Sequence, residues 1–262
     1  MATSKRKSTP TPTLLAYVLH RHDWSVSSLI VELFTRERGR LVVAAKGAKR
    51  PYSQLRPVLL PFQRVLVQLG RTPGDDSVEL HNLRSAEWAG GVPHISGAAL
   101  FAGFYINELV LKLLPRDDAH ATLFDAYVQT LAALQPGDDA ATQRALRAFE
   151  LKLLRELGWL PELHVVTATA AQVQVGLSYS LGADAGVAPM RGAGGAGIGG
   201  AVLISLEAAL AQSDLGVLAQ AAAPAATELR APLRGLLQYH LGTSPLRTRR
   251  VMHSVHKLLE TG

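Results

Sequence analysis

The sequence RLVVAAKGAKR at residues 40–50 passes from small and β-branched apolar residues directly into three cations, Lys46, Lys49 and Arg50. Gly47 lies among them and allows a backbone to approach a ligand closely. Cations that neutralise phosphates release condensed counterions, which gives strong, salt-sensitive binding without sequence preference. The pattern indicates a loop that binds a polyanion. The alternative is an ordinary solvated loop at the end of a strand.

Residues on both sides of this loop extend the candidate site. Arg36, Arg38 and Arg40 precede it, and Tyr52 follows it. Aromatic rings can stack on nucleic-acid bases. Of the aromatic residues near the cations, Tyr52 is the best candidate for stacking, whereas Phe34 and Phe62 fit better in a hydrophobic core, and a core position is also the alternative for Tyr17. A second, smaller basic group lies near the other end of the chain, at Arg247, Arg249 and Arg250.

The charge of the chain is unevenly distributed. Residues 1–71 contain 13 Lys and Arg against three acidic residues, a net charge of +10, whereas the remaining residues carry 14 against 18, a net charge of −4. This separation of sign is typical of a nucleic-acid-binding module joined to a different module.

The elements expected to hold the basic loop are short β-strands. Strands are predicted at residues 14–19, 28–34, 40–45, 55–60, 64–69 and 78–83, with a tight hairpin at Gly39 and a turn at 72–76. About five short strands in some 75 residues predict a small antiparallel barrel, and the oligonucleotide-binding (OB) fold is the preferred type. An SH3-like barrel or part of a sandwich remains the alternative.

From residue 95 onward the apolar period becomes helical. Helices are predicted at residues 98–114 after a Ser96 cap, at 123–134, and from a cap at Asp139 to Gly158. Residues 162–204 suggest a small irregular subdomain with a glycine-rich loop. Further helices are predicted after Ser205, at 228–241 and after Ser244. The fold class is therefore α+β and multidomain, with an N-terminal five-stranded OB barrel followed by a helical domain.

No residue pattern typical of an enzyme is found. The chain contains no cysteine, which excludes disulfides, thiolate nucleophiles and Cys-ligated metals. GAGGAG at 192–197 matches a dinucleotide-binding motif only in composition, because no strand, helix and acidic residue surround it as required. His253 and His256 are interpreted as surface residues. Glu108 and Glu150 lie in apolar helices, where pairing with an arginine across the interface is more common than catalysis. We expect no catalytic residue, metal or cofactor.

The order of these pieces resembles the bacterial DNA-repair and recombination mediator family RecO. The resemblance covers most of the chain and depends on an ordered set of motifs. They are AYVLHRHDWSVSSLIVELFTRERGRLVVAAKGAKR at 16–50, LPF at 60–62, YINEL at 105–109, LFDAY at 123–127, LRAFELKLLRELG at 146–158 and LG…L-R-x-R at 241–249.

The resemblance implies a non-enzymatic, cytoplasmic and nucleoid-associated protein that binds and anneals single- and double-stranded DNA. It implies contacts with RecR, the single-strand-binding protein and, in some lineages, RecF, to help RecA load on coated single strands; no membrane association is implied. The family's basic loop corresponds to Lys46, Gly47, Lys49 and Arg50. The DNA-binding candidates are Arg36, Arg38, Arg40, Lys46, Gly47, Lys49, Arg50, Tyr52, Arg249 and Arg250.

One departure from the family concerns metal binding. Many members carry a four-cysteine zinc site, and here the cysteine-free residues 162–204 occupy that place. The expected organisation is a disordered tail at 1–12, an OB domain at 13–88, a helical domain at 95–161 and 205–262, and a zinc-less subdomain at 162–204. The N-terminal tail has no apolar stretch behind its basic residues, so no secretory signal is expected. An RNA-binding OB protein acting in translation or ribosome assembly is the alternative function.

Overall fold

The computed structural model describes residues 12–70, 80–91, 95–134, 138–190, 197–244, 246–248 and 251. The chain forms two compact units. One consists of Met1–Val92 with Pro115–Ala119, and the other of Pro93–Leu114 with His120–Gly262. The segment Pro115–Ala119 follows the first long helix in sequence but belongs to the N-terminal unit.

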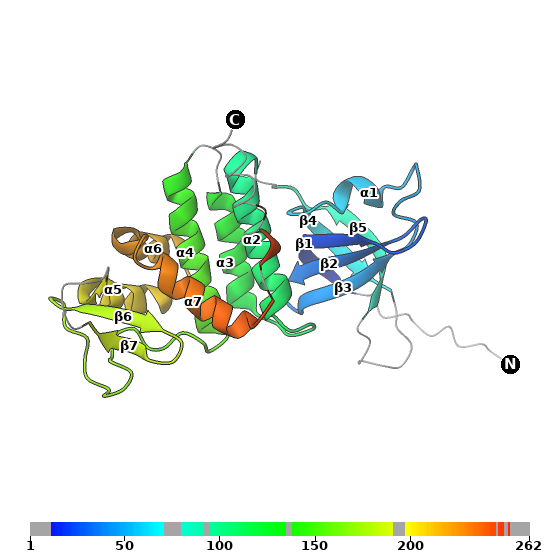
Figure 1. Ribbon diagram of the computed structural model, residues 1–262. Coiled ribbons are helices and arrows are strands. Elements are labelled where there is room, and N and C mark those ends of the chain that lie inside the picture. Colours follow the sequence, from blue (N-terminus) through cyan, green and yellow to red (C-terminus); the bar gives the residue numbers. More distant parts are fainter. Residues whose placement is uncertain are drawn as a thin grey trace. The chain divides into compact units, whose positions relative to one another are not determined.

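The N-terminal unit is a closed five-stranded barrel with strand order β1-β2-β3-β5-β4, which confirms the predicted barrel (Figure 1). Its strands are β1 (Thr13–Asp23), β2 (Leu29–Thr35), β3 (Gly39–Ala45), β4 (Arg64–Leu69) and β5 (His81–Trp88). All neighbouring strands of the barrel pair antiparallel except β3 and β5. These two pair in parallel over two residues, Val43 and Ala44 of β3 with His81 and Asn82 of β5. Alternate apolar side chains fill the interior, because successive residues of a strand point to opposite faces.

Two expectations for the barrel were wrong in detail. Residues 55–60 do not form a strand. They contain the single helical turn α1 (Leu55–Val58), and Leu59 is fully buried in the barrel core just after it. Pro57 explains the difference, because proline cannot donate to a strand ladder but is tolerated in the first turn of a helix. The last strand is His81–Trp88 and therefore extends beyond the predicted end at residue 83, whereas residues 78–79 and the turn expected at 72–76 lie outside the described residues.

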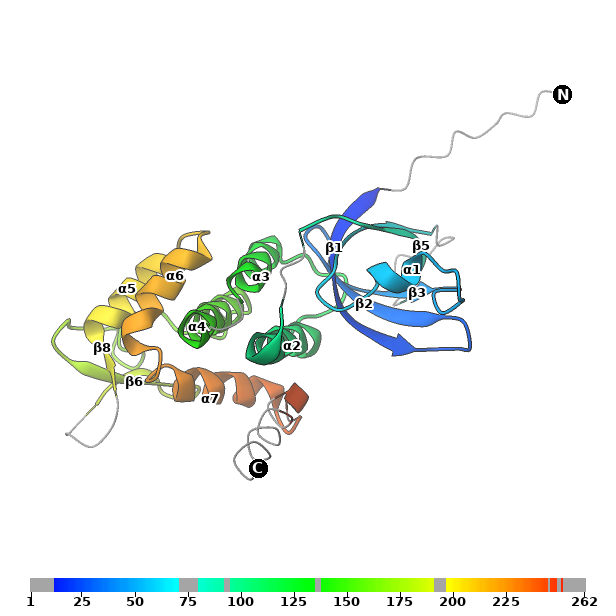
Figure 2. The same cartoon turned by 90° about the horizontal axis from the view of Figure 1, so that it is seen from above.

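The second unit is mainly helical, as predicted. Its long helices are α2 (Gly97–Leu113), α3 (Ala121–Ala133) and α4 (Asp139–Glu156), and α3 lies beside α4 in both views (Figures 1 and 2). Asp138, not Asp139, caps α4, since its Oδ1 accepts the Ala141 N–H at 2.7 Å. No helix in the described parts of the chain has the length and apolar character needed to cross a membrane.

The remainder of this unit combines a small sheet with short helices. The strands β6 (Ser178–Gly182), β7 (Gly186–Pro189) and β8 (Ile198–Gly199) form a sheet of order β7-β6-β8 within residues 162–204. They are followed by α5 (Gly200–Leu210), α6 (Leu215–Ala222), the short 3-10 helix η1 (Ala223–Ala225) and α7 (Arg230–Leu241). Most of the glycine-rich loop, residues 191–196, lies outside the described residues, as does most of the chain after Ser244.

The start of α5 differs from the prediction. Ser205 lies inside this helix, which begins at Gly200. A Cβ at position 200 would lie 2.0 Å from the Gln174 carbonyl oxygen, so a close approach of two backbone segments requires glycine here. A contact between residues 26 apart in sequence leaves no local pattern, and the helix start was therefore missed. Helix α6 was also not predicted; the Asp214 side chain caps it by accepting the Gly216 N–H at 2.7 Å.

The two carboxylates inside the helical unit have structural partners. Glu150 on α4 is 1% exposed; its Oε1 accepts the Tyr105 hydroxyl at 2.6 Å, and its Oε2 lies 3.1 Å from an Arg147 nitrogen. Glu108 on α2 accepts the backbone N–H groups of Arg247 and Thr248 at 2.7 and 2.9 Å. Pairing with an arginine was therefore the right expectation for Glu150, but Arg147 lies on the same helix and not across an interface. For Glu108 the partners are instead backbone groups, the Thr248 hydroxyl and Lys112.

The anchoring of residues 247 and 248 by Glu108 predicts an acid-sensitive contact. Burial by itself would raise the pKa of Glu108, but the N–H groups of Thr248 and Arg247, the Thr248 hydroxyl and the Lys112 charge together lower it below its ordinary value. A lowered folded-state pKa adds stability above the unfolded-state pKa of about 4.3 and loses it as pH falls through the folded-state value. We expect Glu108→Gln to cost about 2–3 kcal/mol at pH 7, as for hydrogen bonds to a charged group.

The measurement is the difference in unfolding free energy between the wild type and Glu108→Gln from pH 7 to pH 3. The difference should shrink toward zero on acidification, because the wild-type carboxylate becomes protonated. Glu162→Gln is the matched control, since Glu162 is exposed and takes part in no described hydrogen bond or ion pair. A Glu108→Gln difference that is independent of pH would contradict this role.

Candidate nucleic-acid interface

The structure divides the predicted basic site into two groups at opposite ends of β3. In the strand register Leu29 pairs with Ala45 at one end, and Thr35 pairs with Gly39 at the other. The hairpin turn (residues 36–38) and Arg40 lie at the second end. The β3–α1 loop (residues 46–54) lies at the first. A seven-residue strand separates the two groups by roughly 20 Å, so they do not form one compact cluster.

The arginines near the hairpin turn are held by the barrel unit itself. Arg38 forms an ion pair with Asp117, whose Oδ2 also lies 3.3 Å from His81 Nε2. Arg40 is half-buried; burial lowers the pKa of its guanidinium, and the Glu32 carboxylate opposes that effect. The Arg40 carbonyl accepts the Asp117 N–H at 2.9 Å. Arg38 and Arg40 thus stabilise the attachment of Pro115–Ala119, whereas Arg36 is exposed to solvent.

The cations of the β3–α1 loop are more accessible. Lys46 and Arg50 are exposed and, within the described part of the chain, form no ion pair. Lys49 is different, since its Nζ lies 3.3 Å from Asp23 Oδ2 and 3.2 Å from the Ser25 carbonyl oxygen. Its backbone N–H also donates to the Ser27 carbonyl at 3.0 Å. Lys49 therefore fastens this loop to the β1–β2 turn, residues 24–28.

Gly47 has a conformational reason to be glycine. Its φ of +74° lies in the left-handed region, which costs an L-residue about 1–2 kcal/mol. The Gly47 carbonyl accepts the Arg50 N–H at 3.1 Å, and the Arg50 side chain lies over the glycine. Gly47 thus forms the turn that directs Arg50, while a close approach of its backbone to a phosphate stays a prediction.

The aromatic residues fall into two classes. Tyr17, Phe34 and Phe62 are 3%, 0% and 6% exposed, so their rings are not available to a base, although none of them belongs to the barrel core cluster. Phe34 and Phe62 are buried, as the sequence favoured, but the predicted place in the barrel core was wrong for Phe34, because Val31 and Leu33 of β2 fill the core and Phe34 points to the opposite face of the strand. Tyr52 is 95% exposed beside the cations of the β3–α1 loop, so its ring is available to stack on a base.

Three residues at this end of the barrel were not predicted as part of the site. Arg21 on β1 and Arg56 on α1 line a pocket beside Tyr52. Trp24, which is 52% exposed, lies in the β1–β2 turn to which Lys49 is fastened. Arg21 and Arg56 are 35 positions apart in sequence, and no local pattern relates them. Arg21 and Trp24 do lie in the motif AYVLHRHDW, which was the available signal.

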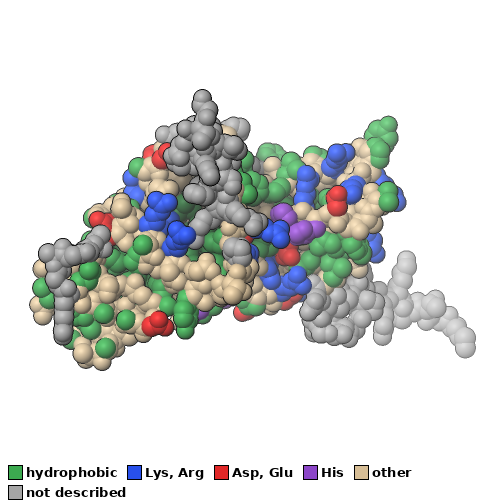
Figure 3. All heavy atoms as spheres, in the orientation of Figure 1, with side chains coloured by type: hydrophobic (Ala, Val, Ile, Leu, Met, Phe, Trp, Pro, Cys, Tyr) green, Lys and Arg blue, Asp and Glu red, His purple; other side chains and the backbone are tan. Residues whose placement is uncertain are grey.

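The arrangement is chemically simple. Exposed cations and an exposed aromatic ring lie at the same end of the barrel. Lys and Arg side chains are spread over the surface of the barrel unit (Figure 3). Such a surface can hold phosphates by charge and bases by stacking.

Of the second basic group, Arg247 is exposed, and Arg249 and Arg250 lie outside the described residues. Among the described residues no group of three or more His, Cys, Asp or Glu could hold a metal ion.

The comparisons with known proteins agree over most of the chain. Residues 13–91 match the family model described as "Recombination protein O N terminal", and residues 96–250 match "Recombination protein O C terminal". A DNA repair protein RecO of Acidovorax ebreus is 46% identical over 255 residues, which cover 93% of this chain and 96% of the relative. The DNA repair protein RecO of Variovorax paradoxus is 48% identical, with the same coverage.

A third relative extends the agreement to almost the full length of both chains. It is the DNA repair protein RecO of Delftia acidovorans, 44% identical over 263 residues, or 98% of this chain and 100% of the relative. Both family models and these relatives coincide with the barrel and with the helical unit described above. The chain therefore belongs to the recombination protein O (RecO) family of DNA repair proteins.

Proposed function

We propose that this protein is a non-enzymatic recombination mediator that holds DNA on the β3–α1 loop of its barrel. The observation that carries the proposal is the exposed group Lys46, Arg50 and Tyr52 at one end of the OB barrel. Lys46 and Arg50 form no ion pair with any residue that the structure describes, so no such pair has to break when they bind phosphates and release counterions. Attachment of this kind is independent of sequence, as a repair protein that meets any damaged site requires.

Annealing follows from the same chemistry. Two complementary single strands repel each other through their phosphates, and a protein that neutralises phosphates on one strand lowers this repulsion. The two strands can then pair without any covalent step, so no nucleophile or cofactor is needed. Single- and double-stranded DNA, RecR, the single-strand-binding protein, RecA and, in some lineages, RecF are the partners in this proposal, and the place of action is the bacterial nucleoid.

The first test is the salt dependence of single-stranded DNA binding by Lys46→Ala/Arg50→Ala. Loss of two phosphate contacts should lower the slope of log K against log salt concentration by about 1.4, at roughly 0.7 per contact for single strands. Arg230→Ala/Arg234→Ala is the matched control, since it removes the same charge from exposed positions on α7. Fluorescence anisotropy from 50 to 300 mM salt measures both slopes.

Equal slopes for the two double variants would overturn the assignment of DNA to the β3–α1 loop. Competition with an RNA of the same sequence tests the alternative function. An RNA-binding protein should prefer RNA through contacts to its 2′-hydroxyl groups, whereas binding through phosphates alone predicts little preference.

A further inference from the structure

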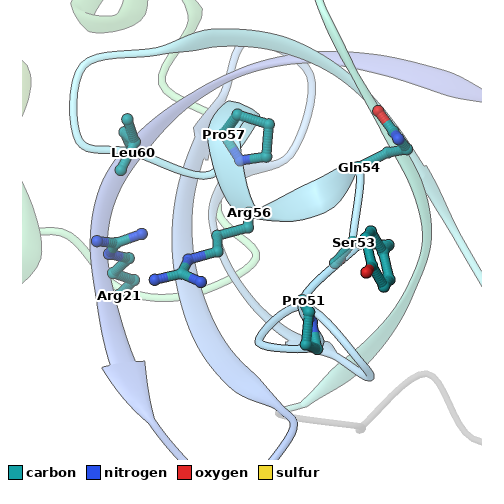
Figure 4. A pocket seen from close by; sticks show the side chains of 8 residues that line it. Arg21, Pro51, Ser53, Gln54, Arg56, Pro57 and Leu60 are labelled. Atoms are coloured by element: carbon teal, nitrogen blue, oxygen red, sulfur yellow. The ribbon is translucent and has the colours of Figure 1, made fainter.

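A pocket beside the β3–α1 loop combines two arginines with apolar and aromatic side chains. Its volume is about 550 Å³, and its lining includes Arg21, Pro51, Tyr52, Arg56, Pro57 and Leu60. It is an open hollow on the surface, since most of its lining residues are exposed. In Figure 4 the Arg56 side chain extends toward that of Arg21 at one side of the pocket.

The arginine side of the pocket is suited to one anionic group. Arg21 comes from β1 and Arg56 from α1, and neither forms an ion pair with any described residue. Like charges held at one pocket without a carboxylate between them repel, and a bound anion removes that repulsion. The planar guanidinium offers paired N–H donors that match the oxygens of a phosphate.

The rest of the lining is suited to a flat apolar group. Tyr52 is 95% exposed, Leu60 is 37% exposed, and two prolines add rigid apolar surface. Exposed aromatic rings beside cations are the usual platform for nucleic-acid bases, because every base presents a π-face. Phosphate and base are joined through the sugar of one nucleotide, and the lining of the pocket offers groups suited to each.

We propose that this pocket holds one unpaired nucleotide of a single DNA strand, with its phosphate between Arg21 and Arg56 and its base against Tyr52. This inference rests on the proposed function and deepens it by naming the form of DNA that this site selects. In a duplex the bases are stacked and paired, so none is available to Tyr52. The pocket therefore favours single strands, whereas Lys46 and Arg50 bind the phosphates of single- and double-stranded DNA alike.

The sequence position of Tyr52 favours DNA over an acidic peptide as the occupant. Pro51 and Tyr52 directly follow Arg50, so a strand lying on the cations of the loop reaches the pocket with its next nucleotides. The regularly spaced phosphates of one DNA strand can bind both Lys46 and Arg50 on the loop and Arg21 and Arg56 in the pocket.

The test compares three probes of equal length: oligo-dT, the same oligonucleotide with abasic sites throughout, and a blunt duplex. Tyr52→Ala should weaken oligo-dT binding about 5- to 100-fold, as for loss of one stacked base, and should leave the abasic and duplex probes unchanged. Tyr52→Phe keeps the ring and should bind like the wild type. Arg21→Ala/Arg56→Ala should weaken oligo-dT and abasic binding more than duplex binding.

Tyr239→Ala is the matched control, since Tyr239 is 61% exposed on α7 and lies outside the pocket. The inference is overturned if Tyr52→Ala affects oligo-dT no more than the abasic probe. Saturable binding of a fluorescent acidic peptide that is abolished in Arg21→Ala/Arg56→Ala would instead assign the pocket to a protein partner. If the wild type binds none of the three DNA probes, the proposed function itself fails.

Discussion

Gly39→Ala is expected to destabilise the barrel unit by about 2–5 kcal/mol, from a left-handed φ and a backbone clash together. Gly39 has a φ of +63°, and a Cβ there would lie 1.7 Å from the Asp118 carbonyl oxygen. The hairpin turn and the segment Pro115–Ala119 would have to move apart. The Arg38–Asp117 ion pair and the hydrogen bond from the Asp117 N–H to the Arg40 carbonyl would then be lost.

The control for this variant isolates the conformational part of the effect. Gly90 has a φ of +75°, and a Cβ there would meet nothing within 4 Å. Gly90→Ala should therefore cost only about 1–2 kcal/mol. Urea titration followed by hydrogen exchange of amides in β2 and β3 reports on the barrel unit by itself. If Gly39→Ala and Gly90→Ala cost the same, the packing of Pro115–Ala119 on the hairpin contributes nothing to stability.

Glu150→Gln is expected to cost about 3–5 kcal/mol, as for one partner removed from a buried ion pair. Glu150 is 1% exposed and Arg147 is 6% exposed. The glutamine oxygen can still accept the Tyr105 hydroxyl, so the change mainly leaves the Arg147 guanidinium charged and without its carboxylate. Urea unfolding followed by circular dichroism at 222 nm measures the loss in the helical unit.

The double variant Arg147→Met/Glu150→Gln tests the cause of this loss. It removes both charges and keeps an oxygen for Tyr105, so it should regain most of the stability lost in Glu150→Gln. A double variant that is less stable than the single variant would show that Arg147 contributes through contacts other than its pairing with Glu150. Neither residue is placed at the nucleic-acid interface, so DNA binding by the folded fraction should be unchanged.

Local patterns in the sequence determined most of the architecture. The hairpin between β2 and β3 followed from two apolar runs around Gly39, and the helices α2, α3 and α4 followed from apolar residues three and four apart. The uneven charge pointed to the N-terminal region as the nucleic-acid-binding part. These signals depend on residues close together in the chain, where backbone geometry alone fixes which side chains share a face.

Only the tertiary structure decided which charged residues are available. In the sequence nothing distinguishes the accessible cations from the others among Arg36, Arg38, Arg40, Lys46 and Arg50. In the structure Arg38 and Arg40 bind Asp117, which lies more than 70 residues later in the chain. Closure of the barrel likewise brings Arg21 to Arg56 and sets Tyr52 beside them. These ion pairs and this pocket depend on contacts between residues that are far apart in the chain. Local sequence patterns cannot predict such contacts.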